Sequence, residues 1–239
     1  MKSRTPVLIV VAVLAVVAVL AAASLTRQRD LEATAPTVTS APATQTTRPS
    51  DGTAGGTLAD LARRVDGDPL AVGAVNAPVV MIEYADFRCP FCGVFARDIK
   101  PDLQRYIDDG TLRIEWRDFP VFGEESMAGA MAGRAAAEQG RFWQWYTVVF
   151  DNAPERGHLD LDDQTITAFA KQAGVADLQR FERDRFDPEI AQSIQSDLNQ
   201  ARSLGMTGTP TFLINDEAII GAQPAEVFVE KIERLAAAA

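Results

Sequence analysis

Two cysteines, Cys89 and Cys92, have the residue type and the spacing that most clearly indicate chemistry, and they are the only cysteines in the 239-residue chain. They form the segment Cys-Pro-Phe-Cys shortly after an apolar run that predicts a buried strand. Such a pair can be a redox centre, half of a zinc site or a structural staple. A structural zinc ion needs four ligands, and the chain offers two Cys and one His. A disulfide that closes so short a loop removes little entropy from the unfolded chain, so a redox pair is the favoured interpretation.

The helix expected to begin at this pair gives the two sulfurs different roles. Residues three apart lie on one face of a helix, so Cys89 can occupy a position near the N-cap with Cys92 one turn further in. Pro90 would take the first helical position, where a missing N–H costs nothing. Unpaired amides and the positive end of the helix dipole favour a thiolate at Cys89, and a stabilised thiolate makes the disulfide form more oxidising. We predict that Cys89 is the reactive sulfur, partly exposed and with a lowered pKa, and that Cys92 is the buried resolving partner.

A second feature lies far along the chain, where Thr209 and Pro210 open a run of apolar and β-branched residues. This run predicts a strand, and proline is confined to strand starts or edges because it cannot donate to the ladder. From the residues alone, the Thr209–Pro210 bond can be either an ordinary trans bond or one of the few cis bonds that proline permits.

Glu83 interrupts the apolar run that precedes the cysteines. An ionisable side chain inside a buried strand costs free energy unless its polar atoms are satisfied or functional. One interpretation is a buried functional acid. The other is a glutamate at a strand edge that pairs with a surface arginine, because Glu is rarely buried.

Together these residues resemble the thioredoxin superfamily, specifically its DsbA-like thiol:disulfide oxidoreductases. The matching stretches are 83–92, 141–145 and 204–212, and the resemblance covers about residues 68–235. It implies an α/β fold with a thioredoxin-like mixed sheet and an inserted all-helical domain that caps the active site.

The resemblance also implies roles for three further residues. Pro210 should be cis and lie beside the cysteine pair, with the backbone of Thr209 pairing with the substrate peptide. Glu83 should lie buried beneath Cys92 with a raised pKa and act as the general base for its thiol. One departure is Phe91, which takes the place of a histidine inside the CxxC segment of the best-known DsbA.

The remaining patterns agree with such a fold. A helical stripe at 58–65 leads to a brief strand near 70–72 and then to the strand 79–85. A helix over 91–109, in which Pro101 predicts a kink, precedes a strand near 111–117. From about 124 to 204 the pattern is helical throughout, and we predict an inserted helical domain; its expected helices are 126–139, 141–151, 162–173, 176–185 and 188–204. Strands at 211–215 and 218–220 and a helix at 225–236 complete the chain.

Four aromatic residues of the insert admit two interpretations. Phe142, Trp143, Trp145 and Tyr146 could line a peptide groove. Aromatic residues dominate cores, so a place in the core of the insert is favoured for each of them.

The first 57 residues divide into two segments outside the folded domain expected at 58–239. Residues 1–25 combine two early cations with a long apolar run, which predicts a transmembrane anchor or a signal peptide. Residues 26–57 are rich in Thr, Ala, Pro, Ser and Gly and predict a disordered linker. Either identity of the first segment puts the domain outside the cytoplasm, where disulfides persist. We expect a single-pass membrane protein, or a secreted or periplasmic one if the segment is cleaved.

These observations predict an extracytoplasmic thiol:disulfide oxidoreductase that donates its Cys89–Cys92 disulfide to exported polypeptides with free thiols. We expect it to need no metal or organic cofactor, and the resemblance implies reoxidation by a quinone-linked membrane partner. The net charge of −10 argues against nucleic acid as a partner, and we expect a monomer. A disulfide reductase or isomerase of the same fold, or a peptide-binding chaperone with a structural disulfide, remain as alternatives that the redox potential would separate.

His158, the only histidine, lies in a polar stretch of the predicted insert. A Cys–His hydrolase would place it against Cys89, but the second cysteine would compromise a dedicated nucleophile. A copper-delivery protein would need a histidine ligand close to the cysteine pair. We expect a solvated loop residue instead.

Overall fold

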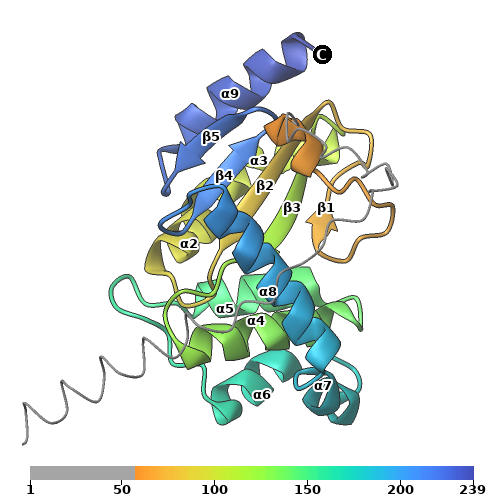
Figure 1. The fold of residues 1–239 in the computed structure, drawn as a ribbon, viewed down its shortest axis with the longest axis vertical. Coiled ribbons are helices and arrows are strands. Elements are labelled where there is room, and N and C mark those ends of the chain that lie inside the picture. Colours follow the sequence, from red (N-terminus) through yellow and green to blue (C-terminus); the bar gives the residue numbers. More distant parts are fainter. Residues whose placement is uncertain (1–56) are drawn as a thin grey trace, which may run out of the picture. The chain divides into compact units, whose positions relative to one another are not determined.

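The computed structural model describes residues 57–239 (Figure 1). The anchor or signal peptide predicted over residues 1–25, and nearly all of the linker predicted over 26–57, lie outside the described residues. From residue 57 onward, no helix combines the length and the hydrophobicity needed to cross a membrane.

A five-stranded mixed sheet forms the centre of the described part, in the order β1-β3-β2-β4-β5. The strands are β1 (Ala71–Val72), β2 (Val79–Ala85), β3 (Leu112–Asp118), β4 (Thr211–Ile214) and β5 (Glu217–Ile220). β2 and β3 run parallel, and the other neighbouring pairs are antiparallel. Every residue of β2 and β3 is buried, as expected for central strands that are covered on both faces. The α/β class and the mixed sheet predicted from the sequence are confirmed.

Helices cover both faces of this sheet. One face packs against α2 (Pro90–Val94), η2 (Phe95–Ile99), α3 (Lys100–Asp108) and the C-terminal α9 (Ala225–Ala237). Three phenylalanines from helix, strand and helix meet there, with ring centroids 4.4 to 5.3 Å apart: Phe95, Phe212 and Phe228. The long α8 (Pro188–Ser203) crosses the other face and packs on β2 through Leu198 and Ala201 (Figure 1).

The helix that follows the cysteine pair is interrupted near Pro101, where a kink was predicted. The interruption takes the form of a π-helical turn. In η2 the amide of Lys100 donates to the carbonyl of Phe95, five residues earlier. Pro101 has no amide hydrogen, so the regular α-helical bond to the carbonyl of Arg97 cannot form. The widened turn just before the proline accommodates the lost bond.

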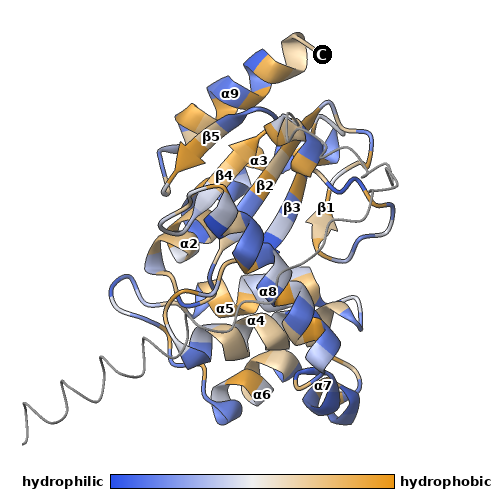
Figure 2. Cartoon of the chain, viewed as in Figure 1, coloured by the Kyte–Doolittle hydropathy of each residue, from blue (hydrophilic) through white to orange (hydrophobic). Residues whose placement is uncertain are grey.

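Five helices follow β3 before the next strand begins, at the positions predicted for the insert. They are α4 (Glu124–Ala137), α5 (Phe142–Asp151), α6 (Asp163–Gln172), α7 (Leu178–Asp184) and α8. Figure 1 shows α4 to α7 gathered below the sheet, with α8 returning across it. Hydrophilic residues cover the outward surfaces of α7 and α8, while the strands are mostly hydrophobic (Figure 2).

The aromatic residues of α5 fill the junction between these helices and the sheet. Phe142, Trp145 and Tyr146 are fully buried, and Trp116 of β3 packs against Phe142 and Tyr146 with ring centroids 5.6 and 5.7 Å apart. The groove interpretation is therefore wrong for these three residues. Trp143 is partly exposed, and its indole nitrogen donates to the carbonyl of Ala71 at 3.2 Å.

The stripe predicted as a helix over 58–65 forms only one 3-10 turn, η1 (Leu58–Leu61). The chain then leaves the helix because the amides of Arg63 and Arg64 donate to the carboxylate of Glu115 in β3, both at 2.8 Å. Hydrogen bonds to the buried Glu115 thus replace the backbone hydrogen bonds that a longer helix would form.

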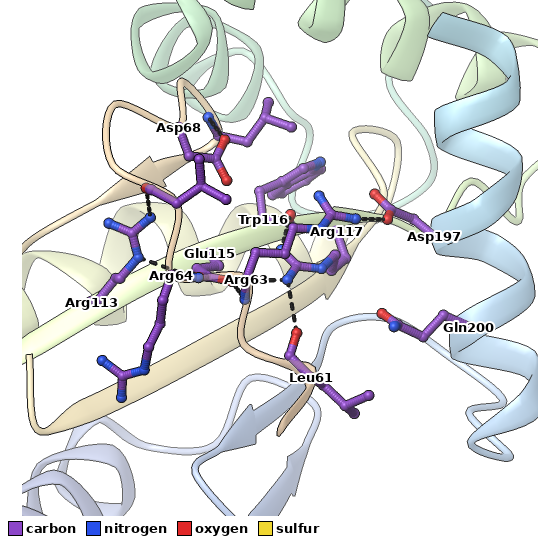
Figure 3. Close-up of polar contacts among 12 residues, drawn as sticks. Leu61, Arg63, Arg64, Asp68, Arg113, Glu115, Trp116, Arg117, Asp197 and Gln200 are labelled. Carbon is purple, nitrogen blue, oxygen red and sulfur yellow. Dashed lines mark hydrogen bonds and ion pairs between the residues drawn. The ribbon is translucent and has the colours of Figure 1, made fainter. Parts of the chain in front are cut away.

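A network of buried charges joins this segment to the sheet and to the insert (Figure 3). Glu115 pairs with Arg113 and Arg117 on its own strand, each at 2.9 Å. Asp197 of α8 pairs with Arg63 and with Arg134 of α4. Arg134 also pairs with Asp118 at 2.6 Å. The N-terminal segment and the helices of the insert are therefore fastened to β3 by charge-assisted hydrogen bonds.

Candidate active site

The cysteine pair occupies the first turn of α2, as the sequence predicts. Cys89 is the N-cap, with extended backbone angles (φ −77°, ψ 119°), and Pro90 takes the first helical position. The amide of Cys89 donates to the carbonyl of Asp86 at 3.0 Å, and the carbonyl of Cys89 accepts from Gly93 at 3.2 Å. Both cysteines are free thiols in the structure.

The prediction that Cys89 is partly exposed is wrong, because only 1% of the residue is accessible to solvent. Its thiol donates to the carbonyl oxygen of Thr209 at 3.2 Å, so the loop before β4 lies against the sulfur. Cys92 is fully buried, as predicted, while Phe91 between the two cysteines is 63% exposed.

Strand register explains why two segments 120 residues apart meet. β4 runs antiparallel to β2 and pairs Thr211 with Tyr84 near the end of β2. The residues just before β4 therefore lie at the same end of the sheet as the segment that leads from β2 to Cys89. The predicted cis bond between Thr209 and Pro210 is confirmed.

The surroundings of the two sulfurs shift their pKa values in opposite directions. The largest influence on the pKa of Cys89 is the hydrogen bond from the Cys92 side chain, which lowers it. Burial raises this pKa. Hydrogen bonds from Thr209 and from the amides of Cys92 and Phe91 lower it further. Together they lower the pKa of Cys89 from 9.0 to about 6. Burial, followed by the hydrogen bond and the charge of Cys89, raises the pKa of Cys92 well above its ordinary value. The predicted lowering of the Cys89 pKa is confirmed.

The hydroxyl of Thr209 can stabilise a thiolate. Its Oγ1 is buried and has no hydrogen-bond partner within residues 57–239 while Cys89 is a thiol. A hydroxyl can donate to a thiolate but gains little from a thiol that already donates to a carbonyl. Ionisation of Cys89 therefore supplies the acceptor that the hydroxyl lacks.

Glu83 is completely buried, and the interpretation as an edge glutamate paired with a surface arginine is wrong. Its carboxyl oxygens accept from the hydroxyl of Tyr146 at 3.3 and 3.5 Å. Burial raises the pKa of Glu83 to about 8, against the charge of Lys100 and the hydrogen bond from Tyr146. The charge of Glu83 contributes to the raised pKa of Cys92, so the two groups are close enough to influence each other.

The two partners of Glu83 were not found by sequence analysis. Lys100, at the start of α3, has a pKa lowered by burial and partly restored by Glu83. Its Nζ lies 5.2 Å from the ring centroid of Trp143 and 5.5 Å from that of Tyr146. Lys100 precedes Leu103 by three residues and so shares the apolar helical face, which is the signal that could have identified it.

The loops of the insert are fastened to the residue before the cysteine pair. Arg88 donates through Nε to the carbonyl of Leu159 at 2.7 Å and through a terminal nitrogen to the carbonyl of Phe122 at 2.8 Å. His158 is exposed, as predicted, but its Nδ1 lies 3.0 Å from the carbonyl oxygen of Arg88. No local pattern indicates this contact, because residues 88 and 158 belong to separate elements.

Metal ligands do not cluster in the part of the chain that the structure describes. Over residues 57–239 no group of three or more His, Cys, Asp or Glu side chains is placed to hold a metal ion. The chemistry that this site offers is that of two thiols with different acidities beside a buried carboxyl group.

The chain is similar to known proteins in sequence and in fold. The thioredoxin family matches residues 66–234. The probable disulfide bond formation protein D of Bacillus cereus is 28% identical over 149 residues, which cover 61% of this chain and 69% of that protein. The Na(+)/H(+) antiporter NhaA 3 of Salinispora tropica is 35% identical over 162 residues, which cover 66% of this chain but only 23% of the antiporter. The crystal structure of Wolbachia pipientis alpha-DsbA1 has a TM-score of 0.65 at 26% identity, covering 75% of this chain and 96% of that one.

Proposed function

The chain belongs to the thioredoxin family and is a DsbA-like thiol:disulfide oxidoreductase, and from this premise we propose that it donates the Cys89–Cys92 disulfide to exported polypeptides. The observation that carries the proposal is the acidity of Cys89, whose pKa is lowered to about 6. Stabilising the thiolate stabilises the reduced protein, and this makes its disulfide a stronger oxidant.

The reaction transfers two electrons from a substrate dithiol to the protein disulfide. A substrate thiolate attacks the sulfur of Cys89, a bond forms between these sulfurs, and the Cys89–Cys92 bond breaks. A second substrate thiolate then attacks the substrate sulfur of this mixed disulfide and displaces Cys89. The substrate leaves as a disulfide, while Cys92 retains a proton and Cys89 remains a thiolate at neutral pH. The low pKa of Cys89 makes it a good leaving group in the second step.

Glu83 is proposed as the proton carrier for Cys92. With a pKa of about 8, its carboxyl group is mostly protonated near neutral pH and can give a proton to the departing Cys92 sulfur. The same group can take the proton back when Cys92 attacks a mixed disulfide. Lys100 and Tyr146 act as positioning residues, because Lys100 acts on Glu83 through its charge and Tyr146 through a hydrogen bond.

Thr209 and Pro210 are proposed to bind the substrate chain next to Cys89. The carbonyl of Thr209 is already a hydrogen-bond acceptor at the edge of the site, 3.2 Å from the sulfur of Cys89. An extended substrate segment can pair with this backbone and bring its own sulfur into line with Cys89.

Placement in the cell and reoxidation are proposed from residues 1–57. We propose that residues 1–25 anchor or export the protein, that residues 26–57 act as a linker, and that 58–239 form an extracytoplasmic monomeric domain. A quinone-linked membrane partner would then reoxidise the cysteine pair. Reduced protein added to membranes of its own organism should be reoxidised faster when quinone is present, and an equal rate without quinone would contradict this route.

The redox potential of the pair tests the direction of the reaction. Equilibration with glutathione should give a potential clearly above the roughly −270 mV of thioredoxin, in the direction of the roughly −120 mV of a strong disulfide donor. The first result supports donation, and the second would identify a reductase. Cys92→Ser should accumulate a mixed disulfide with a disulfide-bonded cysteine peptide, because Cys89 attacks one peptide sulfur and the other leaves as a thiol, whereas Cys89→Ser should not. Accumulation by Cys89→Ser instead would reverse the roles of the two sulfurs.

A further inference from the structure

An apolar cavity of about 200 Å³ lies beside the loop that carries Thr209. Its apolar walls come from η1, the end of α8 and the loop after it, β4 and β5: Leu58, Leu204, Met206, Leu213, Ala218 and Ile220. Phe212 and Ile219 alternate with the strand residues of this set and pack against α9, so the cavity lies on the opposite face of the sheet. The volume is smaller than the roughly 300–1,000 Å³ of small-molecule sites, and it suits a single side chain.

Hydrogen bonds between distant segments hold the walls of this cavity in place. The amide of Ala59 donates to the carboxylate of Asp216 at 3.0 Å, which fastens η1 to the turn between β4 and β5. The amide of Met206 donates to the carbonyl of Ala201 at 3.0 Å, which fastens the loop to α8. The cavity is therefore formed by the fold before anything binds.

The open edge of the sheet runs along the same cavity. β5 is an edge strand of the sheet that residues 57–239 form, and Figure 2 shows it as hydrophobic. Gly221 donates to the carbonyl of Pro210 at 2.8 Å, and hydrogen-bonded pairs alternate along an antiparallel ladder. Ala218 and Ile220 therefore direct their backbone groups away from β4. The carbonyl of Ile220 accepts from the side chain of Gln223 at 2.9 Å, which leaves both amides and the carbonyl of Ala218 facing the open side.

This edge lacks the usual protection against pairing with another chain. Edge strands are commonly guarded by charged side chains, proline or a covering element. The last three residues of β5 are Ala218, Ile219 and Ile220, and none of them is charged or a proline. Ile220 is 73% exposed although it is a large apolar residue. Open amides beside an apolar cavity are the features that an extended polypeptide can use together.

We propose that the cavity and the edge of β5 bind an extended segment of the substrate polypeptide, with an apolar side chain near the substrate cysteine filling the cavity. The inference rests on the proposed function and deepens it, since it names a feature of the substrate that the protein selects. The substrate sulfur must reach Cys89, whose own sulfur lies 3.2 Å from the carbonyl of Thr209. Met206 of the cavity precedes Thr209 by only three residues.

The hydrogen bonds at the start of β4 make the two places continuous. Thr211 also lines the cavity, and its Oγ1 donates to the carbonyl of Gly208 at 2.8 Å, next to Thr209. An extended chain advances about 3.3 Å per residue, so a few residues of substrate span the distance from Cys89 to the cavity. Neighbouring side chains of such a chain point to opposite sides, so only alternate positions can fill the cavity.

Short peptides with one cysteine test this selection. Two such peptide thiols reduce one Cys89–Cys92 disulfide and leave as a peptide disulfide. A single leucine is placed at successive positions on either side of the cysteine, and asparagine replaces it in the matched peptide. The favoured leucine peptide should react about five- to tenfold faster than its asparagine partner, because the leucine side chain is buried. The preference should alternate along the peptide on one side of the cysteine.

Variants of β5 locate the preference in the protein. Ile220→Thr keeps a β-branched residue on the strand and removes apolar surface, so the ratio of leucine to asparagine rates should fall two- to fivefold. Ala218→Phe fills the cavity, so the ratio should fall towards one even though the surface has become more apolar. Val227→Thr is the matched control, since Val227 is an exposed apolar residue of α9, and the ratio should stay that of the parent protein. Rates with dithiothreitol, which has no side chain for the cavity, normalise each variant.

The outcomes separate this inference from the proposed function. A protein that oxidises leucine and asparagine peptides equally would overturn the inference alone, whereas one that oxidises neither peptide would overturn the proposed function as well. A preference of the same size at every leucine position would also overturn the inference, because it indicates unspecific apolar contact. So would a higher ratio in Ala218→Phe. Sedimentation that shows a dimer of the parent protein and a monomer of Ile220→Thr would identify a second copy of the chain as the occupant of this edge and would equally overturn it.

Discussion

Two glutamates on neighbouring strands are both completely buried, yet their pKa values are shifted in opposite directions from the ordinary value. Burial raises the pKa of Glu83 on β2 to about 8, and within residues 57–239 only the hydroxyl of Tyr146 donates a hydrogen bond to its carboxyl group. Burial also acts on Glu115 of β3, but hydrogen bonds from two backbone amides and two arginines hold its pKa at about 2. The four donors around Glu115 outweigh its burial, while the single hydroxyl that reaches Glu83 does not, and this difference leaves only Glu115 ionised at neutral pH.

The register of the sheet places the two acids on opposite faces. β2 and β3 are parallel and pair Glu83 with Trp116 and Ile82 with Glu115. Paired residues point to the same side of a sheet, so Glu83 faces the cysteine helix while Glu115 faces the N-terminal segment. One face keeps a carboxyl group that can exchange a proton, and the other uses a permanently charged carboxylate to hold the structure together.

Replacing Glu115 should have the largest effect. Glu115→Gln leaves Arg113 and Arg117 buried without their anion, and breaking a buried pair in this way costs roughly 3 to 5 kcal/mol. Chemical denaturation should show this loss in the free energy of unfolding. Glu217 pairs with Lys231 and Arg234 at the surface, where solvent screens the charges, so Glu217→Gln is the control and should cost far less stability than Glu115→Gln. Equal losses in the two variants would show that the buried network does not stabilise the fold.

Glu83→Gln should have the next largest effect, and it should raise the free energy of unfolding where Glu115→Gln lowers it. Glu83 has a higher pKa in the folded protein than its ordinary value of 4.5, so it contributes stability at low pH and loses that contribution as pH rises towards about 8. The variant should match the parent protein near pH 4 and be more stable near pH 8, by on the order of 3 kcal/mol. Unfolding curves across this range measure the difference, and a constant difference would contradict the raised pKa.

The same variant should slow disulfide exchange and flatten its pH dependence between about pH 7 and 9, because glutamine carries no proton to Cys92. Stopped-flow measurement of the reaction with a reduced peptide gives both quantities. Unchanged rates with an unchanged profile would remove Glu83 from the mechanism while leaving its effect on stability intact.

Tyr146→Phe sharpens the comparison by removing the hydroxyl that donates to Glu83. The carboxylate then has less stabilisation, so the pKa of Glu83 should rise further and the pH profile of exchange should move upward by about half a unit to one unit. The cost in stability should stay near 1 kcal/mol, because one neutral hydrogen bond is lost. A profile that moves downward would show that the hydroxyl does not donate to Glu83.

The smallest effect is expected at Thr209, where a hydrogen-bond donor lowers the pKa of a buried sulfur. Thr209→Val keeps the shape and removes the hydroxyl that can donate to the Cys89 thiolate, so the pKa of Cys89 should rise and its alkylation near pH 6 should slow a few-fold. Thr207→Val, at an exposed residue of the same loop, should leave the alkylation rate unchanged. Equal rates in the two variants would limit the role of Thr209 to its backbone.

Local sequence pattern determined much of this protein. The apolar run at 79–85 becomes β2 with the predicted bounds, and the position of Cys89 before a proline becomes a helix N-cap. The lowered pKa of Cys89 follows in part from that position, which the order of four residues specifies. Periodicity and helix signals act within a few residues of chain, so a sequence without a structure is enough to read them.

The contacts that separate one buried acid from another were decided only by the tertiary structure. Glu83 and Glu115 both stand in strands, and nothing near them in the chain shows that one meets Tyr146 while the other meets the amides of Arg63 and Arg64. The partner of the reactive sulfur, Thr209, is 120 residues away, and its carbonyl covers a side chain that was expected to be partly exposed. Burial and hydrogen bonding depend on which elements pack together, and that packing is set by strand register and helix placement over the whole domain, beyond the reach of any local pattern.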